Sequence, residues 1–565
     1  MRNYYGINLD EQRAALLAFE EAKPLIENVI KRADAALGQE YSALKFSDYM
    51  LFSKTGDRTT FQLPYFVRRN NCSYLAMAYW LTEDEKYKEP LEDLIIHICD
   101  EYSWCLPAHS LIWDPKTTNQ MLHELDLHQG ETGRMLTDIY LMVGEKLHYL
   151  VKDRIEYEVK RRVIESFKHK EFHWLKPTCK TNWASVCAGA ALVAFMGFGT
   201  KEEIDSVLPA LSQAIEHFLM GIGDDGCCME GCSYWNYGFE YFVIFARLML
   251  VYTNGEVNYF KRDKVKAIAT FIQKARLTET KTISFSDCVP DFSFSPGLLS
   301  YLKTLYPDDV KLPSLKYGTR QGNIFAAKDL LWLSADYKED PFGEGFFYLE
   351  DAEWYIARYK KYSFAAKGGY NAEPHNHNDI GSFSLVTADG NMPLADLGAG
   401  EYTAFTFDPN YRYKMIEHAS FGHSVPIING KYQMFGAEYR TKNAKAYGNS
   451  FSFDMEGAYE EGLITRLNRR FELFPDRIIL TDTAEYSPET ESITERFVST
   501  EKPTLSDGAV DFSGIKLLYD KEKFDAKLTE DSFINHYVKK TNVYLIDVLP
   551  KKEKETEFKF EIIIE

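Results

Sequence analysis

Four of the thirteen histidines in this chain fall between residues 375 and 423, where they form its densest group of chemically active side chains. His375 and His377 stand two residues apart in the segment HNHND, so on a β-strand they would share one face. His377, Asp396 and His423 make a set of two imidazoles and one carboxylate, which suits Zn²⁺. A hydrogen-bonded network in a polar turn is the alternative interpretation of the same residues.

A second group of polar and aromatic residues lies in the first half of the chain. Asn182 stands directly before the apolar run 183–199, and the segment DDGCCMEGCSYWNYG brings Glu230, Tyr234, Trp235 and Tyr237 together before the next predicted helix. Polar loop residues at helix ends are common positions for a binding site. Ordinary core packing, with Trp235 as an anchor, is the alternative.

Three arginines are candidates for binding an anionic ligand. Arg68 and Arg69 are adjacent in FVRRNNCSY, and Arg412 lies near the histidine group. The fork geometry of a guanidinium group suits carboxylates and sulfates. For any one of these arginines, an ordinary solvated surface position is the alternative.

Helices are predicted through the first three hundred residues, because apolar residues recur there near helical spacing. The predicted ranges are 9–37, 74–81, 91–102, 129–143, 150–167, 183–198, 204–221 and 237–252. A succession of helical hairpins suggests an (α/α) toroid, in which outer helices shield inner ones. Such shielding explains the apolar run 183–199, which we interpret as a buried helix and not as a membrane span.

Short alternating stretches replace this pattern from about residue 345, and Asp389-Gly390 and Asn429-Gly430 supply turns between them. Such alternation is typical of an antiparallel β-sandwich. The predicted fold class is therefore α+β and multidomain, with a toroid domain over 1–340 followed by a β-sandwich domain over 341–565.

Composition and charge limit the partners. A chain of 565 residues with 45% hydrophobic content can form more than one core, and its net charge of −19 makes nucleic acid or an anionic membrane an improbable partner. Any positive charge in a site must then be local. No apolar signal-like stretch follows Met1, so a cytoplasmic protein is expected. A homo-oligomer is compatible with the sequence.

Several of these motifs resemble one enzyme family. HNHNDIGSF, LADLGAGEY and SFGHSVPIING are similar to the C-terminal signature of heparinase II/III-like polysaccharide lyases, and TNW and YWNYG resemble motifs of their toroid domain. The resemblance extends from about residue 129 to the C-terminus. It implies an (α/α) toroid joined to antiparallel β-sheets, as the pattern of elements also predicts.

The resemblance also implies roles for single residues. Asn182 matches the position that neutralises a uronate carboxylate, and Tyr237 the catalytic tyrosine, with Tyr234 as the alternative because the loop length differs among relatives. His375 matches a second catalytic base. His377, Asp396 and His423 match the positions of a structural zinc. Some relatives have a histidine near Trp183, so whether His375 or Tyr237 removes the proton stays open.

The implied activity is that of a carbon–oxygen lyase. Such an enzyme removes the C5 proton of a uronic acid and breaks the bond at C4, which leaves a 4,5-unsaturated sugar. An amide can stabilise the charge that develops on the carboxylate, and a histidine or tyrosine can move the protons. The expected substrate is an anionic glycosaminoglycan-like or alginate-like glycan. A glycoside hydrolase, which needs paired acids, and a non-catalytic carbohydrate-binding protein are the alternatives.

Overall fold

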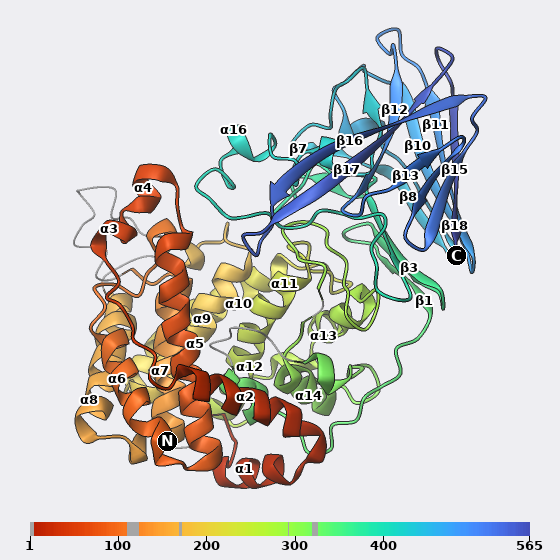
Figure 1. Cartoon of the computed structure of the whole chain (residues 1–565). Helices are drawn as coiled ribbons and strands as arrows, with labels where there is room; N and C mark the ends of the chain where they lie inside the picture. The colour runs from red at the N-terminus through yellow and green to blue at the C-terminus, as the bar shows by residue number, and fades with distance from the viewer. Residues whose placement is uncertain (1–4, 110–123, 169–171, 292, 319–325) are drawn as a thin grey trace. The chain divides into compact units, whose positions relative to one another are not determined.

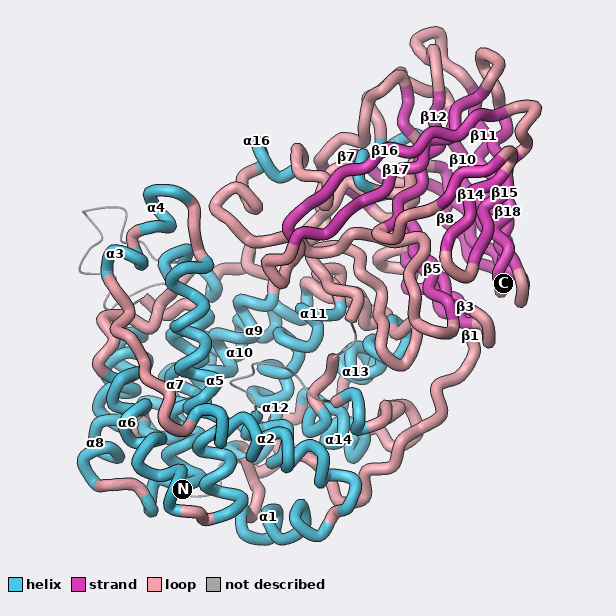
Figure 2. The backbone as a smooth tube through the Cα atoms, in the orientation of Figure 1, coloured by secondary structure: helices cyan, strands magenta, loops and turns pink. Residues whose placement is uncertain are grey.

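The computed structural model describes residues 5–109, 124–168, 172–291, 293–318 and 326–565, and it divides into two compact units. A helical unit comprises Met1–Ile222, Trp235–Ala269 and Ser293–Asp340, and a β-rich unit comprises Gly223–Tyr234, Thr270–Phe292 and Pro341–Glu565. Helices and then strands follow along the chain (Figures 1 and 2). The predicted α+β multidomain architecture is confirmed. Two short segments of the predicted helical half belong to the β-rich unit.

Most of the helices lie in the helical unit; α11 and α16 lie in the β-rich unit, and α13 crosses the boundary between the two. Their bounds are α1 Leu9–Ala18, α2 Lys23–Ala36, α3 Phe46–Tyr49, α4 Leu51–Thr55, α5 Thr59–Thr82, α6 Lys88–Cys99, α7 Leu127–Val143, α8 Tyr149–Val159, α9 Asn182–Phe198, α10 Lys201–Met220, α11 Cys232–Tyr234, α12 Glu240–Tyr252, α13 Asp263–Ala275, α14 Pro296–Leu305, α15 Ala326–Leu331 and α16 Pro409–Arg412.

Helix α9 is the buried helix that the apolar run predicts. It packs against α7, α10 and α12, and nearly every one of its side chains is buried. Close packing depends on glycine, because a Cβ atom at Gly189 would lie 2.7 Å from the backbone oxygen of Tyr241 on α12. Among the described residues, no helix combines the length and the apolarity needed to cross a bilayer.

The strands all belong to the β-rich unit. Their bounds are β1 Gly345–Leu349, β2 Trp354–Arg358, β3 Tyr362–Lys367, β4 Tyr370–Asn371, β5 Phe383–Thr387, β6 Ile427–Ile428, β7 Gly436–Arg440, β8 Lys442–Tyr447, β9 Ser450–Asp454, β10 Arg466–Phe474, β11 Arg477–Glu485, β12 Ile493–Ser499, β13 Thr504–Ser506, β14 Ala509–Phe512, β15 Ile515–Tyr519, β16 Phe524–Ile534, β17 Lys540–Pro550 and β18 Glu557–Ile564.

These strands form antiparallel sheets, three of which contribute to one apolar core. The described sheets are β1-β2-β3-β5, β13-β14-β15-β18-β11-β10-β9-β8, β16-β17-β12-β6 and the pair β4-β7. Phe364 of the first, Phe471 of the second and Phe497 of the third are buried in the same cluster. Every second residue of β10 is buried, so one face of that strand packs inward and the other stays partly exposed.

A buried arginine occupies one of those inward positions. Arg469 stands between Leu467 and Phe471 on β10, and its guanidinium group hydrogen-bonds to the carboxylates of Asp482 and Glu495 at 2.9 and 3.0 Å. It also donates to the backbone oxygens of Gly381 and Ser424, at 2.8 and 2.7 Å. These two oxygens flank the histidine-bearing segments, so Arg469 fixes both segments to the sheet.

Replacing Arg469 with methionine should therefore destabilise the protein strongly. Two carboxyl groups would lose their buried partner, and such losses cost about 3–5 kcal/mol. Arg466 on the same strand is the matched control, because its side chain is 55% exposed and its ion pairs are worth at most about 1 kcal/mol. Urea unfolding of the Arg469→Met and Arg466→Met variants measures both. Equal losses in the two variants would show that Arg469 has no special role.

Candidate functional site

The histidine segment 372–382 is a loop between β4 and β5, not the strand that the residue spacing suggests. His375 has a left-handed backbone, with φ of 57°. Both imidazoles nevertheless reach one carboxylate. Asp287 Oδ2 lies 2.7 Å from Nδ1 of His375, and Asp287 Oδ1 lies 3.0 Å from Nε2 of His377. A shared acceptor, and not a shared strand face, brings the two histidines together.

Asp287 is the centre of this group, and the sequence patterns did not predict it as a site residue. Its side chain is fully buried, Arg412 Nη2 donates to Oδ1 at 3.0 Å, and His418 Nε2 lies 3.2 Å from the same oxygen. Burial alone would raise the pKa of Asp287, but the three imidazoles and the Arg412 charge outweigh it and hold this pKa well below its ordinary value. Asp287 is therefore ionised at neutral pH.

The ionised carboxylate determines which nitrogen of His375 can act as a base. Asp287 accepts a hydrogen bond from Nδ1–H, which leaves the lone pair on Nε2. The His375 side chain is 17% exposed, and Nε2 lies 3.8 Å from Oε2 of the buried Glu230, beyond hydrogen-bond distance. His375 is thus held in one tautomer, with its basic nitrogen able to meet a ligand.

Tyr234 covers one side of this imidazole. Its ring stacks on His375 with centroids 4.2 Å apart, and its hydroxyl lies 2.6 Å from the hydroxyl of Tyr402. Burial, together with the charge of Asp287, raises the pKa of Tyr234 far above its ordinary value. The phenol stays protonated at neutral pH, so Tyr234 can donate a proton but cannot act as a base without further change.

Arg412 has protein partners for its guanidinium group, which argues against the anion-clamp interpretation. Besides Asp287, it donates to the backbone oxygens of His375, Asn376 and Thr406, each at 3.0 Å. The group thereby connects the histidine loop to the segment after β5. We interpret Arg412 as a residue that positions His375 and not as one that binds substrate.

Asn182 and Tyr237 lie in the helical unit. Asn182 is the buried first residue of α9. A Cβ atom at Gly238 would lie 3.1 Å from the Cβ of Asn182, so Tyr237, the residue before Gly238, stands next to a close approach of these two segments. The Tyr237 ring meets the Tyr241 ring edge-on at 6.0 Å. Burial and the charge of Glu131 raise the pKa of Tyr237, which is therefore also a protonated phenol at neutral pH.

Further polar residues of the helical unit surround this pair and were missed in the sequence. Glu131 accepts a hydrogen bond from Tyr241 at 3.3 Å and lies 2.7 Å from Nδ1 of His128. The His128 ring stacks on His109 at 5.5 Å, and His109 and His173 each meet the Trp183 ring, at 4.8 and 4.6 Å. The signal that could have found them is HQGE, which places His128 and Glu131 one turn apart on α7.

The other predicted substrate-binding residues of the helical unit are buried. Trp235 is 1% exposed and its indole donates to the backbone of Ile268 at 2.8 Å, so it is a core anchor. Arg68 and Arg69 both pair with Glu101, at 3.1 and 2.7 Å.

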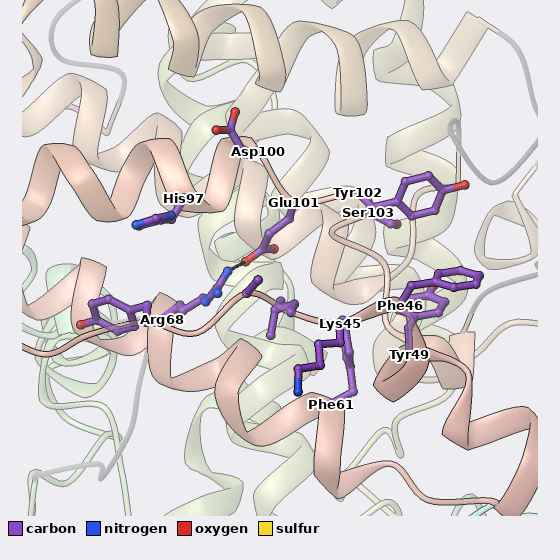
Figure 3. Close-up of a pocket in the computed structure, with 13 residues that line it drawn as sticks. Lys45, Phe46, Tyr49, Phe61, Arg68, His97, Asp100, Glu101, Tyr102 and Ser103 are labelled. Carbon is purple, nitrogen blue, oxygen red and sulfur yellow. Dashed lines mark hydrogen bonds and ion pairs between the residues drawn. The ribbon is translucent and has the colours of Figure 1, made fainter.

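Arg68 and Glu101 also line a cavity of about 660 Å³, whose wall includes the rings of Phe46, Tyr49 and Tyr102 (Figure 3). Glu101 supplies one negative charge to two guanidinium groups, so the three side chains together keep one positive charge beside this cavity.

The predicted zinc ligands divide between two neighbouring groups. In the described part of the chain, the trios whose ligand atoms lie close enough for one ion are Asp287-His377-His418 and Asp379-Asp396-His423. His377 and His423 are 5.5 Å apart by ring centroids, and His423 Nδ1 lies 3.0 Å from Asp396.

The donor set suits a transition metal. Nδ1 of His377 and Nδ1 of His418 are buried and have no hydrogen-bond partner among the described residues. Burial lowers the pKa of His377 to about 3, which keeps the imidazole neutral and able to bind a metal ion.

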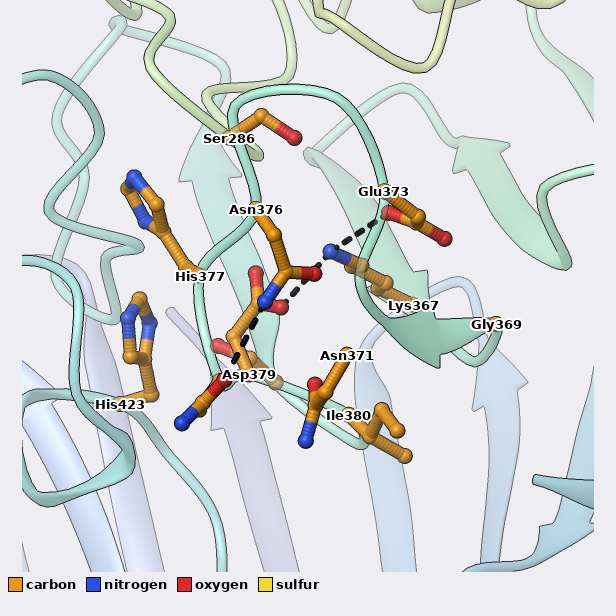
Figure 4. A network of polar contacts seen from close by, with 12 residues as sticks. Ser286, Lys367, Gly369, Asn371, Glu373, Asn376, His377, Asp379, Ile380 and His423 are labelled. Atoms are coloured by element: carbon orange, nitrogen blue, oxygen red, sulfur yellow. Dashed lines mark hydrogen bonds and ion pairs between the residues drawn. The ribbon is translucent and has the colours of Figure 1, made fainter. Parts of the chain in front are cut away.

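A buried lysine sits beside the second trio. Lys367 Nζ lies 2.9 Å from Glu373 and 2.7 Å from Asp379, and all three side chains are fully buried (Figure 4). Burial raises the pKa of Glu373 to about 7, even though Lys367 opposes this change. The Lys367 ammonium already supplies Asp379 with a positive charge.

Similarity to known proteins is found in the fold and not in the sequence. No protein-family model matches the sequence, and no curated protein sequence matches it. Among solved structures, a heparinase III is similar with a TM-score of 0.61 at 12% identity, over 99% of this chain and 92% of that one. A mutant heparan sulfate lyase from Pedobacter heparinus gives 0.59 at 13% identity, over 98% and 87%. Chondroitin AC lyase from Streptomyces coelicolor A3 gives 0.55 at 10% identity, over 98% and 82%. The heparinase-like fold that the motifs imply is therefore confirmed.

Replacing Asp287 with asparagine should lower stability. The amide keeps the shape of the side chain but removes the negative charge that faces the imidazoles and Arg412. The free energy of unfolding should fall by about 3–5 kcal/mol at pH 7. The pKa of Asp287 is lower folded than unfolded, so its contribution is complete above about pH 4 and is lost as pH falls through the folded value. The gap between wild type and variant should persist at pH 5 and narrow below pH 4.

Asp291→Asn is the matched control for this measurement, because Asp291 lies four residues away and is 58% exposed in its pair with Lys281. Thermal unfolding at several pH values compares the two variants. A loss for Asp287→Asn no larger than that for Asp291→Asn would contradict a central role for Asp287.

Metal content should distinguish the two candidate trios. We expect about one tightly held zinc per chain in the purified protein. His377→Ala and His418→Ala should both lose it if Asp287-His377-His418 holds the ion, whereas only His423→Ala should lose it if Asp379-Asp396-His423 does. Loss in His377→Ala and His423→Ala, with the ion kept in His418→Ala, identifies the set that the motifs imply. Elemental analysis before and after chelation, with melting temperatures, provides the measurement. Purified protein that contains no stoichiometric zinc and keeps its melting temperature after chelation would contradict the zinc site.

Proposed function

We propose that this chain is a polysaccharide lyase that cleaves uronic-acid glycans by β-elimination. The observation that carries the proposal is His375, a partly exposed imidazole whose tautomer is fixed by a buried carboxylate and whose ring is stacked on a protonated tyrosine. The fold supports it, because the similar structures are named as heparan sulfate and chondroitin lyases. These names favour an anionic glycosaminoglycan as the substrate.

The reaction needs one group that accepts a proton and one that donates a proton. His375 Nε2 would take the C5 proton of the uronic acid, the C4–O4 bond would break, and the electron pair of the C5–H bond would form the C4=C5 double bond. The leaving O4 would receive a proton from a tyrosine. Both candidate tyrosines have raised pKa values, so they fit the acid role better than the base role.

Two tyrosines and one amide share the roles that remain. Tyr234 is the acid candidate that lies against His375, and Tyr237 is the candidate that the motifs favour. Asn182 would hydrogen-bond the uronate carboxylate and so stabilise the charge that moves onto it. Glu230 faces Nε2 of His375 and would bind a sugar hydroxyl.

The candidate zinc site has a structural role in this proposal. A Zn²⁺ ion held by His377 and its neighbours would cross-link the segments around His375. Asp287 contacts both His375 and His377, so it positions the base and touches this site as well.

The activity is tested by the ultraviolet absorbance of the product, because only elimination creates a C4=C5 double bond. Oligosaccharides of heparan sulfate, chondroitin sulfate, hyaluronan and alginate form the panel. His375→Ala should lower kcat by about 10²–10⁴-fold. Of Tyr234→Phe and Tyr237→Phe, the variant that removes the hydroxyl of the proton donor should lower kcat by a similar factor. Product without a double bond would identify a hydrolase, and binding without product a carbohydrate-binding protein.

Tyr402→Phe is a useful comparison for the tyrosine variants. It removes the hydroxyl partner of Tyr234 but leaves the Tyr234 phenol in place. A loss for Tyr234→Phe that greatly exceeds the loss for Tyr402→Phe supports proton donation by Tyr234. If both Tyr234→Phe and Tyr237→Phe keep a normal kcat, the tyrosine mechanism is wrong.

A further inference from the structure

An exposed phenylalanine stands at the edge of His375. The side chain of Phe407 is 50% exposed, and its ring meets the His375 ring nearly at a right angle, with centroids 5.6 Å apart. It also meets the Tyr402 ring, with centroids 5.1 Å apart. The exposed half of this ring is open to a ligand, and the ring adjoins the candidate base.

The position of Phe407 is fixed by the same group that fixes His375. Arg412 donates to the backbone oxygens of Thr406 and His375, each at 3.0 Å, and its guanidinium carbon lies 5.8 Å from the Phe407 ring centre. The buried side chain of Arg412 thus joins the backbone next to Phe407 to the backbone of His375. The ring and the imidazole are therefore preorganised relative to each other, which lowers the cost of binding a ligand across both.

Two other exposed aromatic residues of this segment are arranged differently. Phe405 and Tyr411 are 45% and 47% exposed, and their rings meet each other at 5.0 Å. In the described part of the chain, neither ring contacts His375. The segment therefore contains one exposed aromatic ring that adjoins the candidate base and a pair that does not, which gives a natural internal control.

We propose that Phe407 binds the C–H face of a sugar ring next to the uronic acid on which His375 acts. This inference rests on the proposed lyase function and adds a binding subsite to it. The face of an aromatic ring carries partial negative charge and attracts polarised C–H groups, while the burial of both surfaces adds a hydrophobic gain. The contact needs no charge on that sugar, so the subsite recognises ring shape and not sulfation.

The proposal predicts a change in binding and not in proton transfer. Phe407 carries no titratable group, so its contact exists equally in the bound substrate and in the transition state, and its loss should raise KM with little change in kcat. Covering the exposed half of the ring is worth about tenfold in affinity. Phe407→Ala and Phe407→Leu should both raise KM by about that factor, whereas Phe407→Tyr and Phe407→Trp should keep it near normal.

The experiment uses the full chain with heparan sulfate and chondroitin sulfate hexasaccharides as probes. Steady-state absorbance gives kcat and KM for the Phe407 variants and for Phe405→Ala, which should match wild type. Calorimetric titration of the same probes into His375→Ala, with and without Phe407→Ala, gives Kd without turnover. Melting temperatures confirm that each variant is folded.

The two proposals fail in different ways. A Kd that is about tenfold higher in His375→Ala/Phe407→Ala than in His375→Ala supports the subsite, whether or not wild type forms an unsaturated product. Absence of that product in wild type would overturn the lyase proposal alone. Product formation with equal KM in Phe407→Ala and Phe405→Ala would overturn the subsite alone. Normal KM in Phe407→Leu would also overturn it, because an apolar side chain without a ring would then suffice. Absence of binding by either probe would overturn it as well.

Discussion

The carboxylate of Asp287 is the constraint on which the candidate site of the β-rich unit depends. A buried negative charge requires partners, and here these are the imidazoles of His375, His377 and His418 and the guanidinium group of Arg412. Satisfying one acceptor in this way brings a loop, a short helix and a segment from far away in sequence to a single point. The hydrogen bond between Asp287 and His375 also fixes the tautomer of His375. One carboxylate thus both stabilises the fold and orients the candidate base.

Two arginines extend this constraint outward. Arg412 holds the backbone around His375, and Arg469 holds the ends of the histidine segments on β10. Each uses the several donors of a guanidinium group to satisfy carbonyl oxygens that loops would otherwise leave unpaired. A lysine, with one charged nitrogen, could not span the same set. The loops of this unit are thus ordered by buried cations attached to regular elements.

Local patterns predicted many of the elements, since these depend on neighbours in the sequence. The predicted helix 9–37 is however two helices, α1 and α2, and α13 and α14 were not predicted. The apolar run gave α9, and alternation gave β10 and β11. The first half of α5 was missed because polar residues and Pro64 obscure its periodicity. The histidine cluster was found by its density, but Asp287 was not, because 88 residues separate it from His375 and nothing local marks it. For the same reason the pairing of Arg68 and Arg69 with Glu101 was not evident.

The β-rich unit is discontinuous in sequence, and this affects how the protein can fold and be divided. Asp287 lies in Thr270–Phe292, while its partners come from residues after Pro341. During synthesis the carboxylate would leave the ribosome long before any group that neutralises it, so the site can assemble only late, through contacts of high sequence separation. A truncation at residue 340 would retain Asp287 but delete every partner of its charge. The natural place to cut this chain is therefore not where its helices give way to strands.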